Sequence, residues 1–131
     1  MLVRTIQRLL SEAQRQVPDC ECVALVDVES GLLFGMTDNA FSAELRELMA
    51  ATAAHWLSHS LSHQLDRAMD RADPSSRVQS FATVSGSTTH IVVRCAAHPE
   101  RAVAFVVRSD ADLHEKVERA RYVATLFDHV F

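Results

Sequence analysis

Glycine is scarce in this sequence, with three residues among 131. Gly31, Gly35 and Gly86 all belong to predicted hairpins, so no glycine-rich loop remains to hold a phosphate group. Neither a GxxxxGKS/T motif nor a GxGxxG motif is present. We therefore expect no nucleotide hydrolysis by this chain, and the sequence indicates no cofactor.

Cysteine and long apolar runs are also scarce. Cys20, Cys22 and Cys95 form an odd set without zinc-knuckle spacing, which predicts reduced thiols. No apolar run approaches the roughly 20 residues that cross a bilayer, and charged residues interrupt the apolar ones from the N-terminus onward. The expectation is a cytoplasmic protein without membrane insertion.

An excess of positive charge is absent as well. The chain has 13 Lys and Arg against 17 Asp and Glu, a formal net charge of −4. Because no basic field would collect phosphates, nucleic acid is not an expected partner. The composition is 48% hydrophobic, which is enough for one core, and residues 1–131 are predicted to form a single domain.

The first part of the chain is patterned as a helix followed by a hairpin. Apolar residues recur every three or four positions in 2–17, which predicts an amphipathic helix that ends at Pro18-Asp19. Residues 21–28 form a continuous apolar run typical of a strand covered on both faces. A turn at 29–31, in which Gly31 can take a positive φ, leads to a returning strand at 32–36.

The rest of the sequence predicts one long helix, three strands and a last helix. Residues 41–71 contain neither Gly nor Pro and form the long helix, which ends at Asp73-Pro74. Strands are expected at 77–85, 88–95 and 102–108. Ser109-Asp110 is the expected cap of the last helix, whose apolar positions are Leu113, Val117, Ala120, Ala124, Phe127 and Phe131. Its charged residues are expected to form a solvated outer face; they are Glu115, Lys116, Glu118, Arg119 and Arg121.

Burial patterns order the strands within an antiparallel sheet. Residues 23–28 and 102–107 are apolar on both faces and should be central, whereas 77–85 alternates with polar residues and should lie at an edge. If the last strand pairs beside the first, the strand order is 2-1-5-4-3. The edge strand around Phe81 would then offer open backbone groups to another chain.

This order of elements resembles the Roadblock family, the Roadblock-type dynein light chains and bacterial Roadblock-domain regulators. The sharpest match is Ala24-Leu25-Val26-Asp27-Val28-Glu29-Ser30-Gly31-Leu32-Leu33, a strand ending in Asp-x-x-x-Gly before further apolar residues. The expected fold is an α+β sandwich of order α-β-β-α-β-β-β-α. One long helix would cover one face of the five-stranded sheet, and the two terminal helices would cover the other.

The resemblance implies a noncatalytic dimeric adaptor or regulator that acts on a small Ras-like GTPase or a related signalling or motility complex. Family members dimerise by antiparallel packing of the long helices and by joining their third strands. A homodimer is therefore expected here. The residues expected at the dimer or partner interface are Trp56, His59 and His63 on the long helix and Gln79, Phe81 and Thr83 on the edge strand.

Three histidines on the long helix leave an alternative open. His55, His59 and His63 follow an i, i+4, i+8 spacing that lines up imidazoles, which can chelate Zn²⁺ or Ni²⁺. Their direction is roughly opposite to that of Leu57, Leu61 and Leu65, so they face solvent or a partner if the leucines cover the sheet. No HExxH glutamate supports a hydrolytic zinc site. A surface or dimer-facing stripe is preferred to metal binding, and a PAS- or GAF-type small-molecule sensor is the other alternative.

Overall fold

The computed structural model describes residues 2–37, 57, 79–108 and 112–130. Its elements, in chain order, are α1 (Leu2–Gln16), β1 (Cys20–Asp27), β2 (Leu33–Met36), β3 (Ser80–Ser85), β4 (Thr88–Arg94), β5 (Arg101–Arg108), α4 (Leu113–Ala124) and the short 3-10 helix η2 (Thr125–Phe127). These elements confirm the predicted helix and strand types, with boundaries shifted by one to three residues.

The five strands form one antiparallel sheet of order β2-β1-β5-β4-β3, as predicted. The two strands predicted to be central, β1 and β5, pair with each other along nearly their whole length. Both contain an uninterrupted buried stretch, at 22–26 and 102–107, because each is covered on both faces. The predicted edge strand β3 ends the sheet on one side, and β2 ends it on the other.

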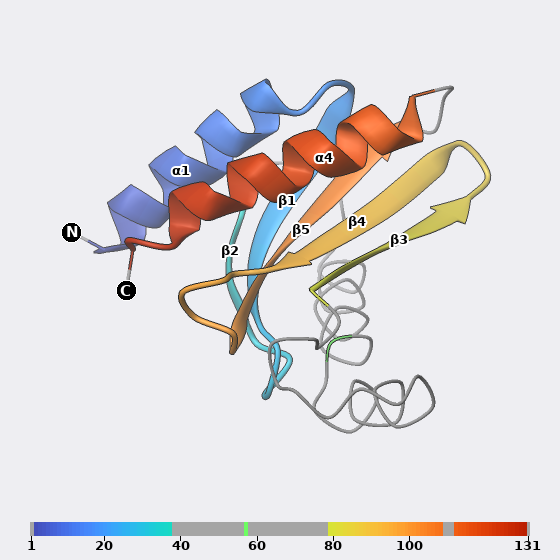
Figure 1. Ribbon diagram of the computed structural model, residues 1–131. Coiled ribbons are helices and arrows are strands. Elements are labelled where there is room, and N and C mark those ends of the chain that lie inside the picture. Colours follow the sequence, from blue (N-terminus) through green and yellow to red (C-terminus); the bar gives the residue numbers. More distant parts are fainter. Residues whose placement is uncertain (1, 38–56, 58–78, 109–111, 131) are drawn as a thin grey trace, which may run out of the picture.

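The sheet carries a hydrophobic core on each face. α1 and α4 lie side by side on one face (Figure 1), where Leu10 and Phe127 pack with Phe105 of β5. The opposite face holds a second core in which Leu57 packs with Val26 and Ala104. Leu57 is helical and fully buried, which confirms the prediction for one of the three leucines expected to cover the sheet; Leu61 and Leu65 lie outside the described residues. The rest of the predicted long helix lies outside the described residues.

α1 forms because its apolar residues fall on one helical face. Ile6, Leu10 and Ala13 are all buried against the sheet. The chain then turns at Asp19, which takes a positive φ of 57°. Gly35 of β2 lies directly beneath the helix, where an added Cβ would stand 3.0 Å from Leu10 Cδ1. No helix among the described residues is long and apolar enough to cross a bilayer.

The last helix departs from its prediction in two ways. Its N-cap is Asp112, not the expected Ser109-Asp110 pair, which lies outside the described residues. Lys116 is also not on the solvated outer face, because only 3% of it is exposed. Its Nζ donates to the Arg108 carbonyl oxygen at 2.7 Å and lies 3.3 Å from Asp19 Oδ2. The ammonium group thus ties α4 to the turn after α1 and to the end of β5.

Candidate functional site

The outer edge of β3 is the candidate interaction site. The β3–β4 pairing is regular from Ser80↔Val93 to Ser85↔Thr88, and Arg94 N–H donates to the Gln79 carbonyl oxygen at 2.7 Å. Alternate residues of an antiparallel strand direct their backbone groups to the same side. Those of Ser80, Ala82 and Val84 therefore point away from β4.

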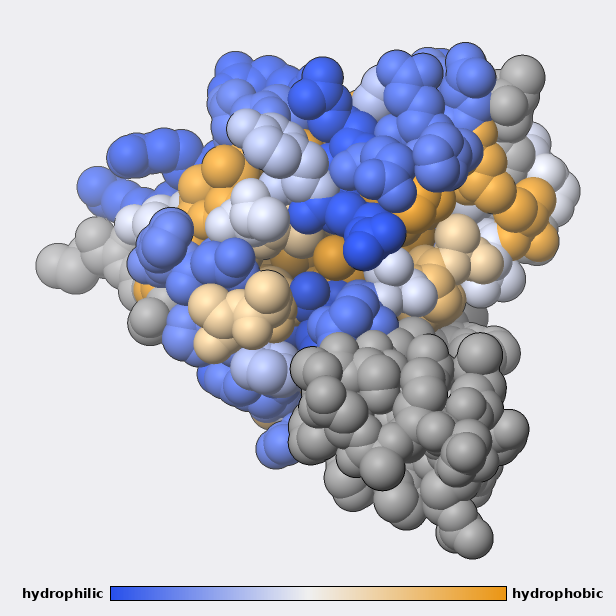
Figure 2. Space-filling view, in the orientation of Figure 1, coloured by the Kyte–Doolittle hydropathy of each residue, from blue (hydrophilic) through white to orange (hydrophobic). Residues whose placement is uncertain are grey.

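Side chains along β3 are exposed to a degree unusual for this sheet. Ala82 and Thr83 are exposed, and 57% of Val84 is accessible to solvent. Figure 2 shows hydrophobic surface at the free end of the β3–β4 hairpin. Phe81 is the exception, because it packs partly into the core that contains Leu57. The strand thus offers polar backbone groups together with apolar side-chain surface.

A tight turn holds β3 in this position. Gly86 and Ser87 connect Ser85 to Thr88, and Gly86 takes a positive φ of 59°. Glycine at the first position of a two-residue turn suits the twist of an antiparallel hairpin. The hairpin therefore fixes which backbone groups of β3 face outward.

The other edge of the sheet is built differently. β2 has four residues, and its register with β1 shifts between Leu25↔Gly35 and Val26↔Leu33. Phe34 is the extra residue of this bulge. The Arg101 guanidinium lies over the Phe34 ring at 4.5 Å from its centroid. A short, bulged edge with a cation over it is poorly suited to adding a strand.

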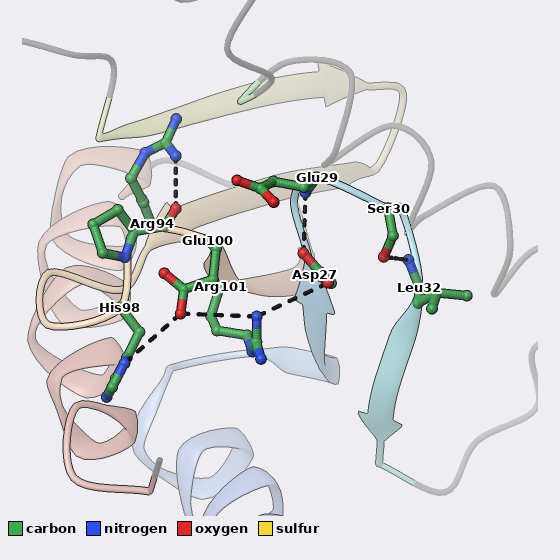
Figure 3. Close-up of polar contacts among 9 residues, drawn as sticks. Asp27, Glu29, Ser30, Leu32, Arg94, His98, Glu100 and Arg101 are labelled. Atoms are coloured by element: carbon green, nitrogen blue, oxygen red, sulfur yellow. Dashed lines mark hydrogen bonds and ion pairs between the residues drawn. The ribbon is translucent and has the colours of Figure 1, made fainter.

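A polar network joins the β1–β2 turn to the loop between β4 and β5 (Figure 3). Arg101 Nη1 lies 3.9 Å from both Asp27 Oδ2 and Glu100 Oε1, and His98 Nδ1 lies 3.8 Å from the same Glu100 oxygen. Asp27 Oδ1 also accepts a hydrogen bond from Glu29 N–H at 3.1 Å, an Asx turn. These contacts stabilise two neighbouring loops. Asp27 therefore has a structural role in the β1–β2 turn, and no catalytic role is needed to account for it.

Arg94 connects the start of β3 to the second core, which contains Leu57. Its Nη2 donates to the Leu57 carbonyl oxygen at 2.6 Å and its Nη1 to the Pro99 carbonyl oxygen at 2.7 Å. The residue is 8% exposed. The sequence does not distinguish Arg94 from other charged residues near strand ends, so its buried role was not predicted.

His90 of β4 was also not anticipated. It pairs with Thr83 of β3, and its Nε2 atom is inaccessible to solvent and has no hydrogen-bond partner. Burial lowers the pKa of this imidazole below its ordinary value. His90 is therefore neutral near pH 7.

The described cysteines are free thiols of low reactivity. Cys22 and Cys95 are buried and Cys20 is half-buried. Burial raises the pKa of Cys20 and of Cys95 to about 12, because the thiolate would lose its hydration. Both thiols are therefore protonated at neutral pH.

The structure describes some of the predicted site residues and not others. Gln79, Phe81 and Thr83 direct their backbone toward β4, and Gln79 lies just before β3. Trp56, His55, His59 and His63 lie outside the described residues. Among the residues that are described, no three His, Cys, Asp or Glu side chains form a metal-binding group. The interface role of the first three residues remains a prediction.

Together, these features define a small α+β domain whose described strands form a five-stranded antiparallel sheet with one regular edge strand, β3. Solved structures with this fold include Roadblock/LC7 domains and the proteins MglB and MglC, and these match nearly the full length of the chain. The resemblance inferred from the order of elements is therefore confirmed at the level of fold.

Three of these structures illustrate the similarity. The Roadblock/LC7 domain from Streptomyces avermitilis is 19% identical over 92% of each chain, with a TM-score of 0.71. MglB from Myxococcus xanthus is 10% identical over 97% of this chain and 94% of its own, with a TM-score of 0.74. An MglB structure with a tetrameric arrangement is 16% identical over 98% and 89%, with a TM-score of 0.68. No family model matches the sequence, and no curated protein is significantly similar to it.

Proposed function

We propose that this chain is a noncatalytic, cytoplasmic adaptor or regulator that acts as a homodimer on a small Ras-like GTPase or a related signalling or motility complex. Two copies would associate by strand addition at β3. The joined sheets would present a composite surface that one copy does not offer. Binding to a partner protein would be the activity of this single domain.

The observation that carries this proposal is the form of the β3 edge. Ser80, Ala82 and Val84 direct their backbone groups away from β4, and the strand has no bulge. Unpaired strand edges of this kind favour pairing with another chain. The bulge at Phe34 makes β2 much less suitable, so β3 is the edge at which a second chain would add.

The fold similarity supports a regulatory role. Proteins that share this fold include Roadblock/LC7 domains and an MglB described with a tetrameric arrangement. Trp56, His59 and His63 would contribute the helical part of the interface, as the resemblance implies. Gln79, Phe81 and Thr83 would contribute the strand part.

A small-molecule sensor is less well supported. The sheet face beneath α1 and α4 is filled by fully buried side chains, among them Leu10, Phe105 and Phe127. A ligand-enclosing site of the PAS or GAF kind would need space between sheet and helices. That space is not available on this face.

Proline substitution tests strand addition because proline removes one backbone donor. Ala82→Pro removes an outward N–H and leaves the β3–β4 ladder complete, whereas Thr83→Pro removes an inward one. We expect the wild type to be dimeric by sedimentation at tens of micromolar. Ala82→Pro should be monomeric with a nearly unchanged melting temperature, and Thr83→Pro should lower the melting temperature.

Leu32→Lys is the matched surface control, because Leu32 is 64% exposed beside the bulged edge. This variant should stay dimeric. A monomeric wild type, or an Ala82→Pro variant that dimerises normally, would contradict the proposed interface. The GTPase step is tested separately by titrating a Ras-like GTPase from the same organism, loaded with GTP or GDP, into the wild type and into Ala82→Pro. Tighter binding to the dimeric wild type is the expected result.

A further inference from the structure

A groove lies between α1 and the strands β1 and β2. Its volume is about 540 Å³, within the range of about 300–1,000 Å³ that ligand sites usually have. Four of its described lining residues come from α1, one begins β1 and one follows β2. These residues are Arg8, Ser11, Gln14, Arg15, Cys20 and Thr37.

The groove is positively charged. Every charged side chain among its described lining residues is an arginine. Arg8 is exposed and has no ion pair or hydrogen bond in the part of the chain that the structure describes. Arg15 donates to Glu12, which also accepts from Gln16 at 3.0 Å. The Cys20 thiol adds no negative charge, because burial raises its pKa to about 12. In a chain with a formal net charge of −4, this groove therefore favours a negatively charged partner.

The uncharged side chains of the groove suit a peptide better than a phosphate group. Gln14 Nε2 donates to the carbonyl oxygens of Cys20 and Glu21, at 3.4 Å and 3.3 Å, which leaves the amide oxygen as an acceptor. The exposed hydroxyl of Ser11 can donate or accept. A phosphate offers acceptor oxygens, whereas a peptide also brings backbone N–H donors. We propose that the groove binds an acidic, extended segment of a partner protein.

The spacing of the two arginines indicates the spacing of the carboxylates that they would bind. Arg8 and Arg15 are two turns apart on α1, on the same side of the helix and about 10 Å apart along its axis. Residues three apart in a polyproline II segment also share one side, at a separation of about 9 Å. A segment with the pattern Glu-x-x-Glu would therefore place one carboxylate at each guanidinium, where the hydrogen bonds are charge-assisted.

An anionic membrane fits this surface less well. Segments that recognise acidic lipids typically gather about four to eight Lys and Arg residues. α1 has three arginines, and Arg15 is already paired with Glu12. The apolar face of α1 cannot insert into lipid, because Ile6 and Leu10 are buried against the sheet.

The groove is independent of the proposed dimer. α1 packs on β1 and β2, whereas β3 lies at the opposite edge of the sheet (Figure 1). An acidic segment bound beside α1 would leave β3 free to pair. This inference therefore adds a second partner surface and does not rest on the first.

Fluorescence anisotropy with three labelled peptides tests the groove. We expect Pro-Glu-Ala-Pro-Glu-Ala to bind the wild type saturably, and Pro-Gln-Ala-Pro-Gln-Ala to bind at least about tenfold more weakly, since it lacks both charges. Pro-Glu-Glu-Pro-Ala-Ala has the same composition with adjacent carboxylates and should also bind more weakly than the first peptide. Added salt should weaken the binding of the first peptide.

Two variants of α1 locate the binding site. Arg8→Gln should weaken binding of the first peptide about tenfold, the loss expected for one charge-assisted hydrogen bond. Arg4→Gln is the matched control, because Arg4 is exposed on the same helix and is not a lining residue of the groove. It should bind the peptide almost as tightly as the wild type. Both variants should keep the wild-type melting temperature.

The outcomes separate this inference from the proposed function. No saturable binding of the acidic peptide, or an equal loss in Arg4→Gln and Arg8→Gln, would overturn the groove while leaving the dimer in place. Tighter binding to vesicles of phosphatidylcholine and phosphatidylserine than to the peptide, lost equally in both variants, would assign the surface to lipid and also overturn it. Ala82→Pro should retain the peptide affinity of the wild type, since the groove needs one copy alone.

Discussion

The Arg94 guanidinium donates a hydrogen bond to the carbonyl oxygen of Leu57 at 2.6 Å, across 37 positions of sequence. Its other terminal nitrogen donates to the Pro99 carbonyl oxygen, and its backbone N–H donates to Gln79. One largely buried side chain thus links the second core, the β4–β5 loop and the start of the candidate edge. This arrangement makes Arg94 the first target for mutation.

Arg94→Met should lower the free energy of unfolding by about 3 kcal/mol, because the buried carbonyl oxygen of Leu57 and the partly buried one of Pro99 lose a charged donor. The free energy of unfolding of Arg94→Lys should lie between those of wild type and Arg94→Met, since an ammonium group keeps the charge but cannot reproduce the forked geometry of the guanidinium. Urea denaturation measures both. Arg119→Met, at an exposed position of α4, is the control and should be nearly neutral. Equal stability of Arg94→Met and wild type would show that these hydrogen bonds contribute nothing.

The contact between Asp19 and Lys116 predicts a coupled pair. Asp19→Asn should destabilise the protein by about 1 kcal/mol, because the buried ammonium loses its carboxylate while Asp19 itself is only partly shielded from solvent. In a Lys116→Met background the same substitution should cost much less. A double-mutant cycle in urea measures the difference, and strictly additive effects would refute the coupling.

Gly35 should be intolerant of a side chain for reasons of space. An alanine Cβ would stand 3.0 Å from Leu10 Cδ1 and 3.1 Å from Ile6 Cγ2, so Gly35→Ala should cost about 1–3 kcal/mol. Combined with Leu10→Ala, which removes the nearest atom, the loss should be smaller than the sum of the two. Thermal and urea unfolding provide the values.

Gly86→Ala is the matched control for that experiment. Its Cβ would meet nothing within 4 Å, but its φ of +59° is unfavourable for alanine. We expect a cost of about 1 kcal/mol from the backbone alone. This cost should add to that of Leu10→Ala without coupling, and a similar coupling for both glycines would argue against the steric explanation at Gly35.

His90 predicts a pH dependence of stability. Burial holds its pKa in the folded state below the ordinary value of 6.5, so the unfolded chain binds more protons as the pH falls through that value. The stabilisation is present above about pH 6.5 and decreases below it, by at most about 1.4 kcal/mol per pH unit. Urea denaturation between pH 7.5 and pH 5 should therefore show a steeper loss for wild type than for His90→Gln. If stability fell with pH equally in wild type and His90→Gln, the pH dependence would not come from His90. His129→Gln controls for the loss of an exposed imidazole.

The sheet was largely predictable because its strands differ in apolar pattern. The continuous apolar runs of residues 23–28 and 102–107 identified the central strands, and the polar alternation near Phe81 identified the edge. Side-chain periodicity also placed Leu57 on the sheet. These features depend on local sequence, which is why they could be inferred without coordinates.

The remaining features depend on contacts between distant segments. Lys116 was assigned to a solvated face, since nothing in its helix reveals that Asp19 and the Arg108 carbonyl oxygen lie within reach. The bulge at Phe34 and the half-buried imidazole of His90 likewise require knowledge of register and packing. Sequence found the edge strand, but the outward direction of Ser80, Ala82 and Val84 follows only from the observed pairing with β4.

The irregular strand at Phe34 has a consequence for assembly. A sheet with two equivalent edge strands could grow without limit, because each added copy would expose another edge strand to which the next copy could pair. Among the described strands, the β3 edge is regular and the β2 edge is bulged and lies under Arg101, so pairing two β3 edges would use the one regular edge of each copy. If two copies pair at β3 as proposed, growth should stop at a closed pair and should not continue into fibres.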